Sequence, residues 1–174
     1  NDAIVAVAEH LAGSEEAFVE QMNRRAAQLG MENTRFVNAT GLDAEGHLTT
    51  ARDISAMARE LLRHDRIVEY STVWMDSLRG GETQLVNTNK LVRYYEGCTG
   101  LKTGTTDGAG SCLAASATRE GLSLVAVSLG SATSADRFDS CRGLLDYGFA
   151  NFTTCQVPDV SDQLARIPVR GGVL

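Results

Sequence analysis

The hydrophobic pattern of this chain changes period near position 72, and that change limits the fold more than any other feature. Before it, apolar residues recur at the spacing of helix faces, as in Ile54, Met57, Ala58 and Leu61. After it, short apolar runs are separated by turn residues, which is typical of antiparallel strands. The pattern therefore predicts an α+β fold, with helices first, then a mostly antiparallel sheet, then a helix.

Local start and stop signals predict the helices of the first half. Ser14, followed by two acidic residues, predicts a helix start, while Gly13 and Gly30 predict helix ends. The segment before Gly13 is largely apolar, which favours a buried helix. Thr50, with Asp53 three residues later, resembles a capping box in front of a third helix.

The second half predicts two hairpins and a closing helix. Glycine-containing turns at 79–81 and 119–121 separate runs with strand-like composition. The predicted strands are 72–78, 83–86, 112–118 and 122–129. We expect a final amphipathic helix to open at Ser134, and the pattern after Cys155 predicts the first strand of another unit.

Composition excludes several classes of function. The net charge is −6 and Lys90 and Lys102 are the only lysines, so a basic nucleic-acid groove is not expected. The apolar runs are too short to span a bilayer. The four cysteines form no C-x-x-C pair, which predicts buried free thiols rather than a zinc site, with one disulfide left open. We expect neither a metal nor an organic cofactor.

The tripeptide Lys102, Thr103 and Gly104 carries the clearest chemical signal. Serine acyl-enzymes that act on β-lactams and on D-Ala-D-Ala combine three short motifs, S-x-x-K, S-x-N and K-T-G. In such sites a base activates the serine, and the glycine lets the strand backbone approach the acyl group. Taken alone, three letters favour the simpler interpretation of an exposed turn with an ordinary lysine.

The residues around the tripeptide change that interpretation, because together they resemble one family. The stretches that carry the resemblance are 33–36, 41–43, 46–47, 49–53, 87–91, 100–110, 113–117, 136–137 and 144–149. They resemble, in order, the low-molecular-mass penicillin-binding proteins that are D-alanyl-D-alanine carboxypeptidases. The resemblance implies a serine β-lactamase/penicillin-binding-protein-like fold. It also implies that 1–152 are the C-terminal portion of the catalytic domain and 153–174 a linker and the start of a small β domain.

The nucleophile of that family is missing from the pattern. No serine has a lysine three residues later, and the lysine that follows Thr99 at this spacing is already that of K-T-G. Asn1 resembles the residue that closes the S-x-N motif. We therefore expect an N-terminally truncated chain that is inactive by itself.

The resemblance assigns roles residue by residue. Lys102 would orient the substrate and assist proton transfer, and Asn1 would point to the substrate amide. Thr103 would hydrogen-bond the substrate carboxylate, while Gly104 and Thr105 would line the strand along which the substrate lies.

Arg137 would lie near the same carboxylate, because a guanidinium offers a planar donor fork. The alternative is a solvated arginine on a helix surface.

By resemblance, the intact protein would be a serine-type carboxypeptidase that trims the terminal D-alanine of peptidoglycan stem peptides and is inhibited by β-lactams. Its site would face the outside of the cytoplasmic membrane. Two alternatives stay open, a serine β-lactamase and a non-catalytic cell-wall-binding protein on the same fold. Exposed sheet edges also suggest a homodimer, or pairing with the missing N-terminal part.

Overall fold

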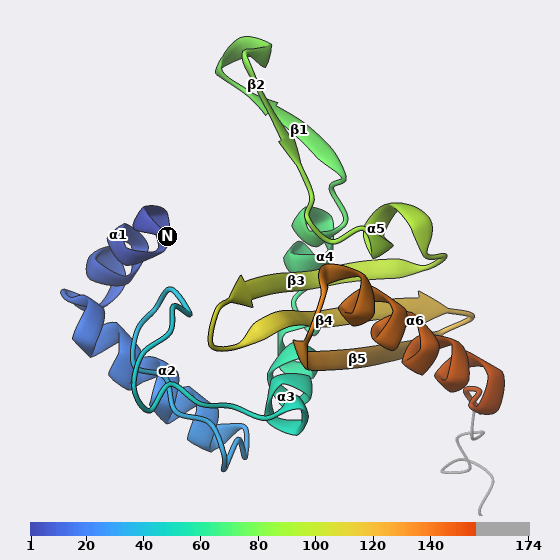
Figure 1. The fold of residues 1–174 in the computed structure, drawn as a ribbon, viewed down its shortest axis with the longest axis horizontal. Helices are drawn as coiled ribbons and strands as arrows, with labels where there is room; N and C mark the ends of the chain where they lie inside the picture. Colours follow the sequence, from blue (N-terminus) through green and yellow to red (C-terminus); the bar gives the residue numbers. More distant parts are fainter. Residues whose placement is uncertain (156–174) are drawn as a thin grey trace, which may run out of the picture.

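The computed structural model describes residues 1–155 and contains helices and two antiparallel sheets, which confirms the α+β prediction (Figure 1). The helices are α1 (Asp2–Ala12), α2 (Glu15–Gln28), α3 (Ala51–Leu61), α4 (Asp65–Ser71), α5 (Leu91–Tyr94) and α6 (Ser134–Asn151). The strands are β1 (Met75–Leu78), β2 (Thr83–Val86), β3 (Cys98–Thr106), β4 (Gly110–Arg119) and β5 (Leu122–Ser131). The further strand predicted after Cys155 lies outside the described residues.

The three-stranded sheet is a meander in the order β3-β4-β5. The predicted turn between β4 and β5 is confirmed, with Arg119 paired to Leu122. Glu120 and Gly121 between them have φ values of 48° and 80°. Positive φ at both central residues is the geometry of a two-residue turn that matches the twist of its strands. This turn therefore fixes the register of the hairpin.

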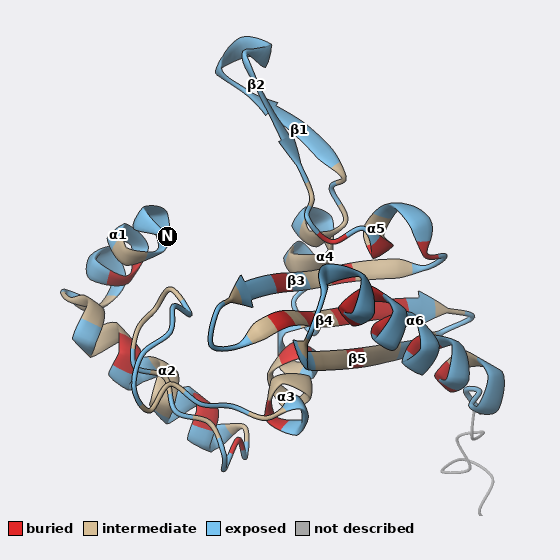
Figure 2. Ribbon diagram, viewed as in Figure 1, coloured by how far each residue is buried: buried red, intermediate tan, exposed pale blue. Residues whose placement is uncertain are grey.

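Helix α6 covers one face of the sheet and forms the main core with it. Alternate residues along β4, Leu113, Ala115 and Ala117, are buried, and the two alanines let the helix approach closely. The residues that α6 contributes to this core are Phe138, Cys141 and Leu145. Figure 2 shows these buried positions along β4 and on the inner side of α6.

Helices α3 and α4 pack behind the sheet (Figure 1). The contact of α4 with β3 is especially close: the Ser71 hydroxyl donates to the Thr99 carbonyl at 2.5 Å. A Cβ atom at Gly100 would lie 2.7 Å from the side chain of Ser71. The glycine before the K-T-G tripeptide therefore allows a helix to pack directly against this strand.

Helices α1 and α2 confirm the predicted signals but not the predicted burial. Gly13 ends α1 with φ 86°, and the Ser14 hydroxyl accepts the Ala17 amide at 3.1 Å. Among the residues of α1, however, Ala8 alone is buried and Leu11 is 63% exposed, so the prediction of a buried helix is wrong. The principal packing partner of α1 in the described part of the chain is α2, and one neighbour covers one side of a helix.

The predicted capping box at the start of α3 is half right. The Thr50 hydroxyl accepts the Asp53 amide at 3.1 Å, as a cap should. No hydrogen bond from the Thr50 amide to the Asp53 carboxylate is found in the described structure. Instead, Oδ2 of Asp53 accepts the Asn33 amide at 2.9 Å and the Thr34 hydroxyl at 2.7 Å. Asp53 is buried and thus ties the preceding loop to α3.

The hairpin of β1 and β2 projects from the rest of the molecule (Figure 1). Its second strand and its turn lie where they were predicted, but its first strand begins at Met75 instead of residue 72. The reason is α4, which the sequence did not predict and whose last turn is capped at Thr72.

The cysteines only partly follow the prediction of buried free thiols. Cys141 is a buried free thiol, while Cys98 and Cys112 are half-buried free thiols. Burial raises the pKa of the Cys141 thiol to about 11, which lowers its reactivity. Cys155 is exposed, so the prediction of burial is wrong there.

A neighbouring pair on α6 tests the packing of the core. Leu145 is 1% exposed and Leu144 is 53% exposed, although the sequence pattern counted both as apolar helix positions. We expect Leu145→Ala to lower the free energy of unfolding by about 2–5 kcal/mol, because it leaves a cavity. Leu144→Ala should cost less than about 0.5 kcal/mol. Urea unfolding measures both, and equal losses would contradict this packing.

The loop anchored by Asp53 predicts a loss of stability in acid. The Thr34 hydroxyl, helped by the Asn33 amide, holds the pKa of Asp53 below its ordinary value. This stabilisation is therefore complete above the unfolded-state pKa of about 3.9 and is lost as pH falls through the folded-state pKa. Unfolding followed from pH 6 to about pH 2 should show a weaker pH dependence for Asp53→Asn than for the wild type.

Two substitutions of Thr34 provide matched controls for that measurement. Thr34→Ser keeps the hydroxyl, so the pH dependence of its free energy of unfolding should match that of the wild type. Thr34→Val loses the hydroxyl, so its pH dependence should be weaker and closer to that of Asp53→Asn. A curve for Asp53→Asn that runs parallel to the wild type would disprove the role given to this carboxylate.

Candidate active site on the K-T-G strand

Strand β3, the K-T-G strand, is an edge of the three-stranded sheet. One side of it pairs with β4, where Lys102 lies opposite Ala114 and Gly104 opposite Cys112. Its other side pairs with no strand among residues 1–155. An edge of this kind presents backbone N–H and C=O groups that can bind an extended peptide.

The residues of the tripeptide alternate between the two faces of the strand, with Lys102 and Gly104 on one face and Thr103 on the other. Lys102 and Gly104 are exposed, while Thr103 is buried between them. The Thr103 hydroxyl lies 2.6 Å from the hydroxyl of Thr88, in the loop before α5. Thr88 therefore fixes the side chain of Thr103.

Arg137, in the first turns of α6, connects that helix to two strands of the sheet. Its Nη1 donates to the Gly104 carbonyl at 2.9 Å and to the Thr105 hydroxyl at 3.0 Å. It also lies 3.3 Å from the Cys112 carbonyl on β4, and Nη2 donates to Ser134 at 3.0 Å. The side chain is 7% exposed, so the alternative of a solvated surface arginine is wrong.

The guanidinium of Arg137 has no anionic partner among the described residues. The ion pairs found there are Arg25–Glu60, Arg63–Glu60 and Arg142–Asp139. Nε of Arg137 is buried and donates to no acceptor in the same part of the chain. Because burying an uncompensated cation is unfavourable, this arrangement favours an anion at the end of β3.

Lys102 adds a second positive charge to the same strand. Its ammonium group donates to the carbonyl of Thr103 and forms no ion pair within residues 1–155. Lys102 and Arg137 together make this edge suited to a carboxylate.

Asn1 is not brought into this group. It is the N-cap of α1, its side chain makes no cap hydrogen bond, and it is exposed. No hydrogen bond joins it to β3 in the described structure. Thr99, whose spacing to Lys102 imitates T-x-x-K, bonds the Ser116 hydroxyl at 2.7 Å and holds the strands together.

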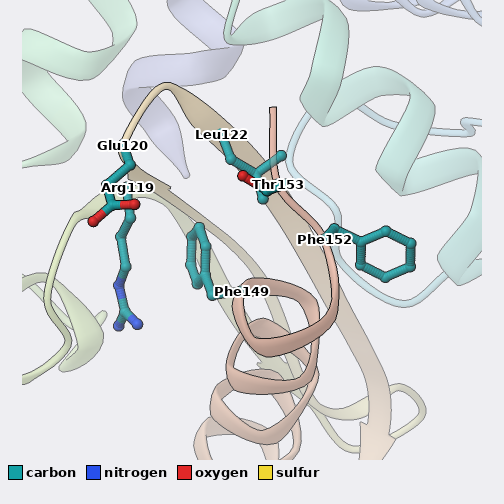
Figure 3. Close-up of a pocket in the computed structure, with 6 residues that line it drawn as sticks. All are labelled: Arg119, Glu120, Leu122, Phe149, Phe152 and Thr153. Carbon is teal, nitrogen blue, oxygen red and sulfur yellow. The ribbon is translucent and has the colours of Figure 1, made fainter. Parts of the chain in front are cut away.

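Two hollows lie away from the K-T-G tripeptide. One, of about 220 Å³, lies between the turn that joins β4 to β5 and the C-terminal end of α6 (Figure 3). There Arg119 stacks between the rings of Tyr95 and Phe149, with its guanidinium carbon 4.6 and 4.5 Å from the ring centres. The other, of about 530 Å³, is formed by the loops around Asn33 and Thr49. Neither contains a residue of the K-T-G strand.

Sequence reasoning missed two residues that hold this strand. Thr88 fixes Thr103, and Asp43 bonds the turn that follows Thr106. Both lie in stretches that carried the family resemblance, but no local pattern indicates which distant residue a threonine or an aspartate will bind.

Residues 1–155 contain neither a metal-binding cluster nor a helix suited to cross a membrane. No three His, Cys, Asp or Glu side chains gather there in a way that could hold a metal ion. Nor does any helix in this range combine the length and the apolar character that a bilayer crossing requires.

Comparison with known proteins gives consistent matches. A family model described as D-alanyl-D-alanine carboxypeptidase matches residues 1–133. D-alanyl-D-alanine carboxypeptidase DacF of Bacillus subtilis (strain 168) is 40% identical over 175 residues, which cover 99% of this chain and 45% of the relative. DacC of Escherichia coli (strain K12) is 40% identical over 155 residues, covering 88% and 38%. The chain thus spans less than half the length of these relatives.

Solved structures agree with the sequence matches. Penicillin-binding protein 6B from Escherichia coli superposes with a TM-score of 0.84 at 34% identity, covering 94% of this chain and 51% of that one. Penicillin-binding protein D2 from Listeria monocytogenes, in a cefotaxime-bound form, gives a TM-score of 0.78 at 33% identity, with coverages of 86% and 61%.

Proposed function

Because this chain belongs to the D-alanyl-D-alanine carboxypeptidase family, we propose that the whole protein removes the terminal D-alanine of peptidoglycan stem peptides. Its membership, and with it the penicillin-binding-protein-like fold, agrees with the resemblance stated from the sequence. The single observation that carries the proposal is the buried Arg137 guanidinium, which lacks an anionic partner in residues 1–155 and lies on the strand of the K-T-G tripeptide.

The substrate supplies the anion that Arg137 lacks. A stem peptide ends in a carboxylate, and an extended peptide can lie along the free edge of β3 with that carboxylate toward Arg137. Arg137 bonds the Gly104 carbonyl and the Thr105 hydroxyl, so it also fixes the part of the strand that would line the peptide. This position supports the roles expected for Gly104 and Thr105.

Thr103 and Thr88 form a pair that can present a donor to the same carboxylate. A hydroxyl has one proton and two acceptor sites. If Thr88 donates to Thr103, the proton of Thr103 is left for the substrate, whose carboxylate can only accept. The role of Thr103 in carboxylate binding thus needs Thr88 in the donor orientation.

The reaction is acyl transfer through a serine ester. The serine oxygen attacks the carbonyl between the two D-alanines, the C–N bond breaks, and D-alanine leaves with a proton on its amine. Water then hydrolyses the ester and regenerates the serine. Lys102 assists the proton transfers. The role expected for Asn1, to orient the substrate amide, would require Asn1 to approach β3, to which no hydrogen bond joins it in the described structure. In the mechanism implied by the resemblance, the serine belongs to a Ser-x-x-Lys pair, and no serine of this sequence has a lysine three residues later.

A cell-wall substrate would require this reaction to take place on the outer side of the cytoplasmic membrane. β-Lactams would inhibit by forming a slowly hydrolysed ester at the same serine. With β3 left to the substrate, the edge of β5, which pairs with no further strand among residues 1–155, is the surface through which copies of the chain, or an upstream segment, would pair.

Covalent labelling by fluorescent penicillin tests this proposal. We expect the chain as given to stay unlabelled and the chain extended upstream through a Ser-x-x-Lys segment to be labelled. Measured turnover of penicillin and of a D-Ala-D-Ala peptide then separates a β-lactamase from a carboxypeptidase. If the extended chain carries the serine and still fails to label, a non-catalytic cell-wall-binding protein is the better interpretation.

Substitution of Arg137 tests its role in the whole protein. Arg137→Lys keeps the charge but loses the donor fork that binds two strand groups and a carboxylate. We expect the second-order rate constant of acylation to fall about tenfold to a hundredfold, the value of a hydrogen bond to a charged group. Arg142→Lys, on the exposed side of the same helix, should leave it unchanged. Equal rates for wild type and Arg137→Lys would exclude carboxylate binding by Arg137.

A further inference from the structure

Asp43 connects the helical part of the molecule to the end of the K-T-G strand. The Thr106 hydroxyl donates to Oδ1 of Asp43 at 2.6 Å, and the Gly108 amide donates to Oδ2 at 2.9 Å. Both carboxylate oxygens are therefore engaged by the turn between β3 and β4. In the described structure these are the only hydrogen bonds between residues 1–50 and residues 96–154.

The loop that carries Asp43 is itself well fixed. Oδ1 of Asn38 accepts the Gly41 amide at 2.8 Å, and Nδ2 of Asn38 donates to the Leu42 carbonyl at 2.9 Å. The Ala39 amide donates to Glu15, in the first turn of α2, at 2.9 Å. Asp43 thus projects from a loop that is bound to α2 and not from a freely moving segment.

The turn on the other side is shaped to receive the carboxylate. Oγ1 of Thr106 accepts the Ala109 amide at 3.0 Å while its proton goes to Asp43. A Cβ atom at Gly108 would lie 3.1 Å from the Asp43 carboxylate, so the glycine allows the backbone to come this close. The Thr106 hydroxyl and then the Gly108 amide lower the pKa of Asp43, which keeps it ionised at neutral pH.

The bonded turn lies next to the candidate site. Thr106 follows Thr105, whose hydroxyl binds Arg137, and is two residues from Gly104. The end of β3 is therefore held by α6 through Arg137 and by the helical part through Asp43. On its free edge this stretch of β3 has no strand partner among residues 1–155.

We propose that Asp43 is a positioning residue, which holds Gly104 and Thr105 in place relative to the helical part of the molecule while acyl transfer takes place. The inference rests on the proposed function, because the position of these two residues matters for catalysis only if the substrate lies along β3. A displacement of about 1 Å in such a site can cost a hundredfold in rate.

A series of variants of the whole protein separates the two bonds of Asp43. Asp43→Ala removes both, and Asp43→Asn keeps an acceptor for Thr106 but places an NH₂ group against the Gly108 amide. Thr106→Val removes the hydroxyl, and Thr106→Ser keeps it. Asp107→Asn is the matched control, since it changes one charge in the same turn at a carboxylate that makes no hydrogen bond in the described structure.

The measurements are the second-order rate constant of acylation by fluorescent penicillin, and kcat and KM for a D-Ala-D-Ala peptide, all well below the melting temperature of each variant. We expect Asp43→Ala to lower the acylation rate about tenfold to a hundredfold, chiefly through kcat. The rate constants of Asp43→Asn and Thr106→Val should lie between those of the wild type and Asp43→Ala. Those of Thr106→Ser and Asp107→Asn should match the wild type. Asp43→Ala combined with Thr106→Val should lose less than the product of the two separate losses, because both break one contact.

Two outcomes overturn the proposal. One is that the wild-type protein is acylated by penicillin and that the Asp43→Ala variant is acylated at the same rate. The other is a loss in Asp43→Ala that multiplies fully with that of Thr106→Val, because the two residues would then act independently. A wild-type whole protein that is never acylated would instead overturn the proposed function, and the positioning role with it, so the two failures are distinguishable.

Discussion

The arrangement of the site depends on one buried guanidinium. Arg137 reaches from the start of α6 to carbonyl groups on β3 and β4, and thereby fixes where the helix meets the sheet. Burying a cation without a carboxylate partner is unfavourable. The carbonyl dipoles, and the Phe138 ring over which the guanidinium carbon lies 5.1 Å from the centre, compensate only part of that cost. A substrate carboxylate would supply the remainder, which links the packing of α6 to the proposed chemistry.

The rest of the sheet is built so that this helix can lie close to it. Ala115 and Ala117 leave room for the inner face of α6, and Cys141 and Leu145 fill that room. The Cys141 thiol lies 3.8 Å from the Leu113 carbonyl and 3.7 Å from the Ala126 carbonyl. On the other side, Gly100 lets α4 lie directly against β3. The K-T-G strand is thus supported by helices while its outer edge is left without a strand among the described residues, as a peptide-binding strand requires.

The sequence predicted those features that neighbouring residues decide. Gly13 and Ser14 form the junction between α1 and α2, and Glu120 and Gly121 form the tight turn between β4 and β5, because each depends on backbone conformation or on a hydrogen bond a few residues away. The K-T-G tripeptide was likewise visible as a motif. The sequence pattern could not rank Leu144 against Leu145, because which of two adjacent apolar residues faces the sheet depends on how α6 is rotated against it.

The sequence by itself therefore indicated the α+β class, the junction between α1 and α2, the tight turn between β4 and β5, the family and the residues of the K-T-G strand, but not α4 or α5. Only the tertiary structure decided that Arg137 is buried, that Thr88 holds Thr103, and that Asp43 binds the turn after β3. The physical reason is the range of each interaction. A cap or a turn is completed within a few residues, whereas a carboxylate or a guanidinium takes whichever donors and acceptors the packed chain brings to it, and Asp43 finds its partners more than sixty residues away.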